Sequence, residues 1–299
     1  LSIGKIYVDN RFKTSDSYSD AHFKFELKES VQLPDKCVCF VDDVVIPHSW
    51  YNVEENSKYL YVRRFWDGTA SLNTDRVIAL EVQNHTFDSL KNALQSSLDA
   101  AFGSGVFTVT KNDRSGIITI AIETQSEVKV FTDAELQGSN DWSGASYDSS
   151  NLMSANEVLG VLTPQQGTSV KTSLVDLRRY HNIYLSFLTL SSYSTLGPRG
   201  ENNIIKKVPV TSDYGSMIFD SVVASHDWTD VSKRLLKTLE FRLSDAYGRT
   251  IDFHGIPVSF SLIFMIQDDW IWFIILILIF LSKHIYIYNR MTTQIGVAD

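Results

Sequence analysis

The chain has 299 residues, a formal net charge of −8 at pH 7 and a pI of about 5.4. This acidic balance excludes a global positive field, so nucleic-acid binding by the whole surface is not expected. A chain of this length buries roughly three quarters of its unfolded surface, which allows one large β domain or two smaller ones.

The first sixty residues alternate as half-buried strands do. Phe23, Phe25 and Leu27 are separated by charged residues, while residues 37–45 form an almost continuous apolar run. An extended aromatic and β-branched segment resumes at residues 59–62. Short strands with polar connections are typical of an antiparallel sandwich.

Two cysteines, Cys37 and Cys39, are the only ones in the chain. They lie two apart, so both point to one face of a strand in a geometry that does not suit a disulfide between them. No Cys-x-x-Cys motif or nearby His cluster accompanies them. We interpret them as buried thiols of a protein from a reducing compartment, in preference to a metal or redox site.

The periodicity changes to that of a helix after residue 85, and a helix-containing insertion is expected over about residues 86–165. Thr86 is a candidate N-cap, and one apolar stripe predicts a helix that ends near Gly103 and lies on the sheet, formed by Phe87, Leu90, Leu94 and Leu98. Residues 106–110 and 117–122 are expected to form a hairpin.

Two capping boxes predict short helices further along the insertion, at Thr132 with Glu135 and at Ser154 with Glu157. The loop between them is rich in Gly, Ser, Asn and Asp, and is expected to be ordered around its aromatic residues.

The second half returns to strands, at residues 183–190, 204–210 and 217–223. Leu239, Phe241 and Leu243 then share one face of a strand.

A turn and a last strand complete this half of the chain. Asp245 and Gly248 take the first and fourth positions of a type I turn. Residues 258–264 alternate as a final strand, expected beside its hairpin partner. The pattern predicts a mainly β protein: a single antiparallel sandwich over residues 1–267 that carries the helix-containing insertion.

Motifs of catalysis are absent from the sequence: no phosphate-cradling glycine loop, HExxH or GxSxG occurs. His48 and Ser49 beside Asp42 are interpreted as turn-forming residues rather than as a nucleophile and its base. Arg178 and Arg179 are expected to pair with acidic neighbours, in preference to binding an anion. We therefore expect no enzyme activity and no cofactor.

Several strings together carry a family resemblance: residues 177–184 (LRRYHNIY), 196–200 (LGPRG), 204–210 and 239–264. In combination the sequence resembles the penton-type minor capsid proteins of Polinton-like viruses and related tailless double-stranded DNA viruses and elements. The resemblance implies a single jelly roll, a homo-oligomer, expected as a pentamer at capsid vertices, and a place in the virion beside a major capsid protein.

Loop residues are the candidate partner contacts, namely Trp142, Tyr147, Arg199 and Trp228. Two other functions stay open: a membrane-tethered sandwich that binds a ligand, and a carbohydrate-binding jelly roll whose tryptophans stack on sugars. For the second, the candidates are Trp50, Trp66, Trp142 and Trp228, although tryptophans are more often half-buried core or loop anchors.

The tail, residues 268–299, differs sharply in composition. Trp270 to Leu281 is an uninterrupted apolar run of twelve residues, which as a helix would span about 18 Å against about 30 Å of bilayer hydrocarbon. Extending it to residue 288 gives about 28 Å but includes Lys283. The candidate membrane residues are Trp270, Trp272, Leu281 and Lys283.

Three interpretations of this tail remain: a membrane anchor, a buried or interfacial segment, and a read-through or gene-model extension outside the folded unit. A sandwich closed by its last strand is expected to offer no further face to such a run, and an exposed run would invite aggregation, so the third interpretation stands level with the first.

Overall fold

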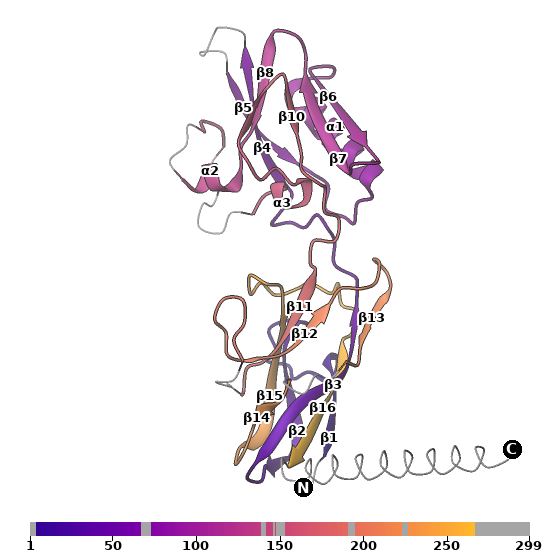
Figure 1. The fold of residues 1–299 in the computed structure, drawn as a ribbon, viewed down its shortest axis with the longest axis vertical. Coiled ribbons are helices and arrows are strands. Elements are labelled where there is room, and N and C mark those ends of the chain that lie inside the picture. Colours follow the sequence, from indigo (N-terminus) through magenta and orange to yellow (C-terminus); the bar gives the residue numbers. More distant parts are fainter. Residues whose placement is uncertain are drawn as a thin grey trace, which may run out of the picture. The chain divides into compact units, whose positions relative to one another are not determined.

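The computed structural model describes residues 4–66, 73–138, 142–145, 147, 153–190, 195–222 and 227–266. The chain divides into two compact units (Figure 1). Unit 1 consists of Leu1–Ser49 and Asn182–Asp299, and unit 2 of Trp50–His181. The candidate membrane residues Trp270, Trp272, Leu281 and Lys283 lie outside the described residues.

Unit 1 is built from two antiparallel sheets. Sheet A has the order β1-β16-β3-β13, with β14 paired to the other end of β3. Its strands are β1 (Lys5–Asp9), β16 (Ser259–Ile266), β3 (Cys37–Pro47), β13 (Met217–Asp220) and β14 (Thr229–Asp230). Sheet B has the order β12-β11-β15-β2, with β12 (Ile204–Pro209), β11 (Asn182–Phe187), β15 (Leu235–Ser244) and β2 (His22–Gln32).

The strands of unit 1 follow jelly-roll order, changing sheet at every step along the chain except from β11 to β12 and from β13 to β14. β1, β3, β13 and β16 belong to sheet A, and β2, β11, β12 and β15 to sheet B. The predicted fold class, a mainly β antiparallel jelly roll, is therefore confirmed.

Phenylalanines from both sheets fill the middle of the sandwich. The ring of Phe241 on β15 lies 4.7 Å from that of Phe187 on β11 and 4.9 Å from that of Phe260 on β16, and Phe23 on β2 lies 5.7 Å from Phe241. All four are buried. The alternation predicted for β15 therefore identified its buried face correctly.

The expected pairing of the last two strands is wrong. β16 pairs with β1 and β3, whereas β15 pairs with β11 and β2 in the other sheet. The turn is present, with Gly248 donating its backbone N–H to Asp245 and holding a φ of 76°. The chain then crosses between the sheets, because an alternating pattern identifies a buried face but not the strand beside it.

The described residues of unit 2 form two sheets and three helices. One sheet has the order β5-β4-β8-β9 and the other β10-β7-β6. The strands are β4 (Tyr59–Trp66), β5 (Thr74–Ala79), β6 (Phe107–Asn112), β7 (Ile117–Ile122), β8 (Ser126–Val130), β9 (Gln165–Gly167) and β10 (Ser169–Lys171). The helices are α1 (Phe87–Phe102), α2 (Asp133–Gln137) and α3 (Asn156–Leu159). The expected insertion, residues 86–165, lies within this unit, which also includes β4 because that strand pairs with both β5 and β8.

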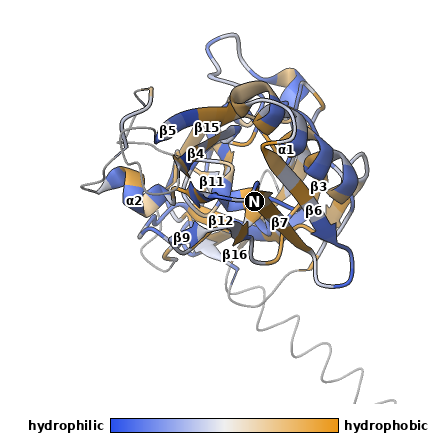
Figure 2. Cartoon of the chain, turned by 90° about the horizontal axis from the view of Figure 1, so that it is seen from above, coloured by the Kyte–Doolittle hydropathy of each residue, from blue (hydrophilic) through white to orange (hydrophobic). Residues whose placement is uncertain are grey.

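Helix α1 forms as predicted. Thr86 caps it and Gly103 follows its last turn. Its buried leucines, Leu90, Leu94 and Leu98, share one core with both sheets of the unit. Figure 2 shows polar and apolar residues mixed along α1, whereas β7 is mainly apolar. The predicted hairpin is β6 paired with β7.

The two predicted capping boxes have different outcomes. Thr132 and Glu135 form one at α2. At α3 the box is absent, because the N-cap is Ala155 and the Ser154 hydroxyl donates to the carboxylate of Asp133 instead. A sequence match to a capping box thus gives way when a stronger acceptor lies nearby.

Both cysteines are free and buried, as predicted. Burial raises the pKa of each thiol, and for Cys39 it does so far above the usual range. Neither thiol is therefore activated as a nucleophile.

Candidate functional site

Four connections of unit 1 meet at one end of the sandwich. The strand registers place Asp9 opposite Ser259 and Pro47 opposite Met217, with Pro209 opposite Asn182. That end therefore carries residues 10–21, 210–216 and 245–258, together with the points where the chain leaves β3 and enters β11. We call residues 10–21, 48–49, 210–216 and 245–258 the loop end.

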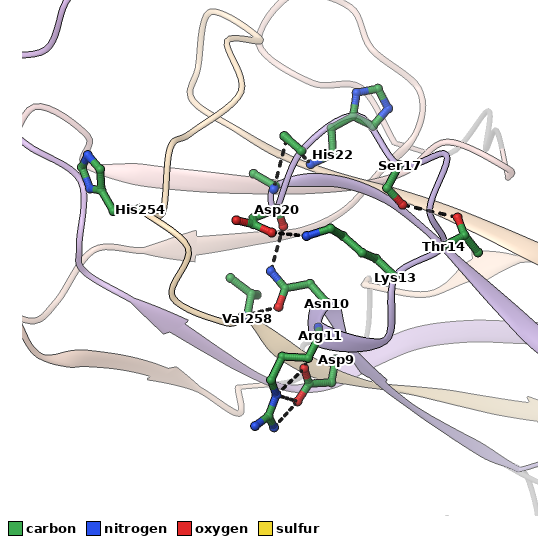
Figure 3. A network of polar contacts seen from close by, with 12 residues as sticks. Asp9, Asn10, Arg11, Lys13, Thr14, Ser17, Asp20, His22, His254 and Val258 are labelled. Atoms are coloured by element: carbon green, nitrogen blue, oxygen red, sulfur yellow. Dashed lines mark hydrogen bonds and ion pairs between the residues drawn. The ribbon is translucent and has the colours of Figure 1, made fainter.

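Asn10 ties two of these connections together (Figure 3). Its side-chain N–H donates to the carbonyl of Asp20 at 2.9 Å, and its side-chain oxygen accepts from the backbone N–H of Val258 at 3.1 Å. The backbone N–H of Asn10 donates to the carbonyl of Val258. With only 3% exposure, this amide fixes the chain entering β16 against the chain leaving β1.

His48 and Ser49 fasten the other connections. The Ser49 hydroxyl donates to the carbonyl of Phe253 at 2.8 Å, and Nδ1 of His254 lies 2.7 Å from the carbonyl of Ser49. Nδ1 of His48 lies 2.7 Å from the carbonyl of Ser212, and burial lowers the pKa of that imidazole. These bonds fit the turn-forming interpretation, because the Ser49 proton is donated to a backbone carbonyl and not to a histidine.

Large apolar side chains project from the loop end. Phe12 is 72% exposed and Tyr18 is 70% exposed, with the Tyr18 ring stacked 4.5 Å from His22. Tyr214, Tyr247 and Ile256 are also exposed. This concentration is typical of a protein contact surface.

Ion pairs lie between these apolar side chains. Lys24 contacts Asp16 at 2.7 Å, Arg11 contacts Asp9 at 2.6 Å, and Lys13 pairs with Asp20. Each of these charges is paired within residues 9–20 or with Lys24 on the neighbouring strand β2. We therefore interpret them as stabilising the conformation of this connection and not as a ligand-binding site.

The edges of sheet A carry two further exposed aromatic residues. Tyr7 on the edge strand β1 and Phe219 on the edge strand β13 are each 72% exposed. Met217 on β13 and Val222 beyond it add apolar surface at the second edge. The sequence analysis identified neither these edge residues nor the exposed residues of the loop end. For the edges a signal was present, because Tyr7 and Phe219 are aromatic residues at strand positions that face away from the core, where polar residues are expected.

The predicted contact residues do not converge on one site. Arg199 is exposed, and its guanidinium donates to the carbonyl of Tyr247 at 2.6 Å, which joins residues 195–201 to the loop end. Trp228 is half-buried against Phe40 on sheet A, with 6.5 Å between ring centroids.

Trp142 and Tyr147 belong to a small core of unit 2. Their rings lie 5.4 and 5.3 Å from that of Tyr61, and the Tyr147 hydroxyl donates to the carbonyl of Leu136. Asp75 accepts from the backbone and hydroxyl of Ser143, so the neighbouring loop is anchored by polar bonds as well.

The other candidate sugar-binding tryptophans differ in exposure. Trp50 is 1% exposed and lies 5.7 Å from the ring of Tyr180, so it offers no face to a sugar. Trp66 is partly exposed, but the guanidinium of Arg64 lies 3.5 Å from its ring centroid. The arrangement supports anchoring rather than carbohydrate stacking.

Arg179 pairs with an acidic neighbour, as predicted. Its guanidinium lies 3.3 Å from the carboxylate of Glu54 and donates to the hydroxyl of Ser57 at 2.6 Å. Within the described ranges, no group of three or more His, Cys, Asp or Glu side chains is placed to hold a metal ion. The part of the chain that the structure describes includes no helix long and apolar enough to span a membrane.

Comparison with known proteins finds similarity among solved structures only. No protein-family model matches the chain. No curated protein matches it either. The chain is similar to the crystal structure of a selenomethionine-labelled mavirus penton protein, with 9% identity over 88% of this chain and 99% of that chain and a TM-score of 0.48. The jelly-roll assignment of unit 1 stands on its own strand order.

Proposed function

We propose that the protein is a structural subunit of a viral capsid, of the penton type, that works by fitting against copies of itself and against a major capsid protein. The assignment to penton-type capsid subunits comes from the sequence resemblance described above. The jelly-roll order of unit 1 is the architecture that the class requires.

The observation that carries the proposal is the pair of unlike apolar edges on sheet A. A ring of identical subunits needs two different patches on each subunit, because the interface is head-to-tail. β1 presents Tyr7 at one edge, and β13 presents Phe219 with Met217 at the other. An edge strand also has backbone groups without a neighbour in the sheet, and covering such edges by association prevents uncontrolled pairing.

The loop end supplies a second contact surface. Its exposed Phe12, Tyr18 and Tyr247 lie among connections that Asn10 and Ser49 hold in place. A rigid apolar surface loses little conformational entropy on binding, as an assembly contact requires. These exposed apolar surfaces support the proposal that unit 1 contacts both copies of itself and another capsid component.

Native mass measurement of the full chain tests this proposal. Five chains of 33.9 kDa give a discrete species of about 170 kDa if the ring closes with fivefold symmetry. Mixing with a major capsid protein from the same virus should then give a larger complex. A strictly monomeric chain at high concentration would contradict the proposal, as would a monomer that binds a glycan array.

A further inference from the structure

The β1 edge of sheet A presents backbone hydrogen-bonding groups as well as an aromatic side chain. Gly4 accepts a backbone hydrogen bond from β16, and Asn10 donates one to Val258, just before that strand. Hydrogen-bonded positions recur at every second residue of an antiparallel strand, so the even-numbered residues of β1 bond to β16. The N–H and C=O groups of Tyr7 therefore point away from β16, toward the edge.

The β13 edge is arranged in the same way. The backbone N–H of His48 donates to the carbonyl of Ser216, so the even-numbered residues of β13 bond to β3. The backbone groups of Met217 and Phe219 therefore point toward this second edge. Within the described part of unit 1, no strand pairs with the outward side of β1 or of β13.

The two edges run in opposite directions. Each neighbouring pair of strands in the order β1-β16-β3-β13 is antiparallel, so β1 and β13 are antiparallel to each other. A second copy that continues sheet A therefore brings its β13 antiparallel to β1 of the first copy. This is the arrangement that all the strand pairs of the sheet already have.

We propose that β1 of one copy pairs with β13 of the next through backbone hydrogen bonds, with Tyr7 opposite Phe219, so that sheet A continues from copy to copy. This inference rests on the proposed function and specifies its lateral contact. In this register Lys5–Asp9 lies opposite residues 217–221, which uses the full length of both strands.

The side chains fit this register. Ile6, Val8 and Ile218 are buried, so Tyr7 and Phe219 lie on the outer face of sheet A. Each of these two rings is 72% exposed in the single chain. As cross-strand neighbours the two rings contact each other and shield one another from water, which stabilises the pairing of the strands.

Charge at one end of this contact is complementary. In an antiparallel pair, the segment that leaves β1 meets the segment that enters β13. The first carries Arg11, whose side chain is 66% exposed although it pairs with Asp9. The second carries the exposed Asp213, which makes no ion pair with another described residue. A head-to-tail contact thus brings a cation to an acidic side chain.

Disulfide trapping in the full chain tests the proposal. Chains carrying Tyr7→Cys and chains carrying Phe219→Cys are mixed at low concentration, concentrated and oxidised. A hydrogen-bonded pair places its Cα atoms about 5.5 Å apart, which suits a disulfide. The native Cys37 and Cys39 are buried and their pKa values are raised, so they should not compete. We expect the disulfide between positions 7 and 219 to form at least tenfold faster than one between Tyr7→Cys and Thr238→Cys, on the outer face of sheet B.

The register is tested by Met217→Cys, on the same edge as Phe219. In the proposed register, residue 217 is a diagonal neighbour of Tyr7 at about 7–8 Å, so its disulfide with Tyr7→Cys should form at least fivefold more slowly than that of Phe219→Cys. Equal rates for the two positions would contradict the register. Faster disulfide formation between two Tyr7→Cys chains, or between two Phe219→Cys chains, would show that like edges pair. Either result overturns the proposal.

A proline substitution tests the backbone hydrogen bonds. Phe219→Ala and Phe219→Pro both remove the aromatic ring, but only proline also removes the N–H that points to the edge, a position where strands tolerate it. Sedimentation velocity should give a dissociation constant at least fivefold higher for Phe219→Pro than for Phe219→Ala. An oligomer with equal constants and without the disulfide between positions 7 and 219 would overturn this inference and leave the proposed function standing. A strictly monomeric wild-type chain would overturn both.

Discussion

The two outer faces of unit 1 are built from opposite kinds of side chain. On sheet B, cross-strand neighbours on the outer face are polar: Lys24 opposite Glu240, His22 opposite Arg242 and Glu26 opposite Thr238. Nε2 of His22 lies 2.8 Å from the Glu240 carboxylate, bridging two of these pairs.

On sheet A the corresponding outer pairs are apolar: Phe40 opposite Ile263, Val38 opposite Met265 and Val45 opposite Phe219. An antiparallel sheet of a sandwich ordinarily has one buried and one wet face, and sheet B follows that rule. Sheet A has apolar side chains on both faces. Sheet B therefore presents a polar outer face to water, whereas the outer face of sheet A is apolar and, under the proposed function, is the face expected to contact another protein.

The largest expected effect is on the free energy of unfolding, which should respond differently to substitutions on the two outer faces. Phe40→Ala, on sheet A, should lower the free energy of unfolding of unit 1 by about 3 kcal/mol, because a buried aromatic ring and its contact with Trp228 are lost. Thr238→Ala, on sheet B, should change it by less than about 0.5 kcal/mol. Urea titration followed by tryptophan fluorescence measures both. A loss below about 1 kcal/mol for Phe40→Ala would show that the outer face of sheet A is not an extension of the core.

A smaller effect is expected on association. Phe219→Asp places a charge on the exposed edge of sheet A and should raise the dissociation constant of the oligomer at least tenfold, about 1.4 kcal/mol. Thr238→Asp introduces the same charge on sheet B and should leave the constant unchanged. Sedimentation velocity over a concentration series gives both values. Equal weakening by the two substitutions would remove the distinction between the faces.

The smallest expected effect is on the pH dependence of stability, through the ion pair between Asp16 and Lys24 on β2 of sheet B. The Lys24 ammonium, and then the Thr14 hydroxyl, lower the pKa of Asp16 from 3.8 to about 2. A carboxyl whose folded pKa lies below its unfolded value stabilises the fold above the unfolded value, and this contribution is lost as pH falls toward the folded one. Asp16→Asn should therefore flatten the fall in stability between about pH 4 and pH 2.

NMR titration of the Asp16 carboxyl provides the measurement. A pKa near 3.8 would contradict the ion pair with Lys24. Added salt should narrow the difference between wild type and Asp16→Asn, since exposed pairs are screened. No comparable salt effect is expected for Phe40→Ala.

Much of this contrast could be predicted from the sequence. Leu239, Phe241 and Leu243 alternate with polar residues, and their strand has one wet face. Residues 37–45 form a nearly continuous apolar run, and their strand is apolar on both faces, as runs without alternation indicate. Thr86 and Gly103 likewise marked the ends of α1, because capping is a local interaction.

Which strands pair with each other, and which distant residues meet, could not be predicted in the same way. Strands β15 and β16 have equivalent alternation, and only the tertiary fold decides that they face each other across the core rather than pair. The importance of Asn10 follows from its position opposite Val258, nearly 250 residues further along the chain. A single sequence does not carry such pairings, since the strand order brings them together.

Hydroxyl-radical footprinting of the full chain, at concentrations above and below its association midpoint, tests most directly whether sheet A is the contact face. Oxidation of Tyr7 and Phe219 should fall several-fold on association, while that of Tyr184 on the outer face of sheet B stays constant. Unchanged oxidation of Tyr7 and Phe219, or an equal fall at Tyr184, would contradict the account.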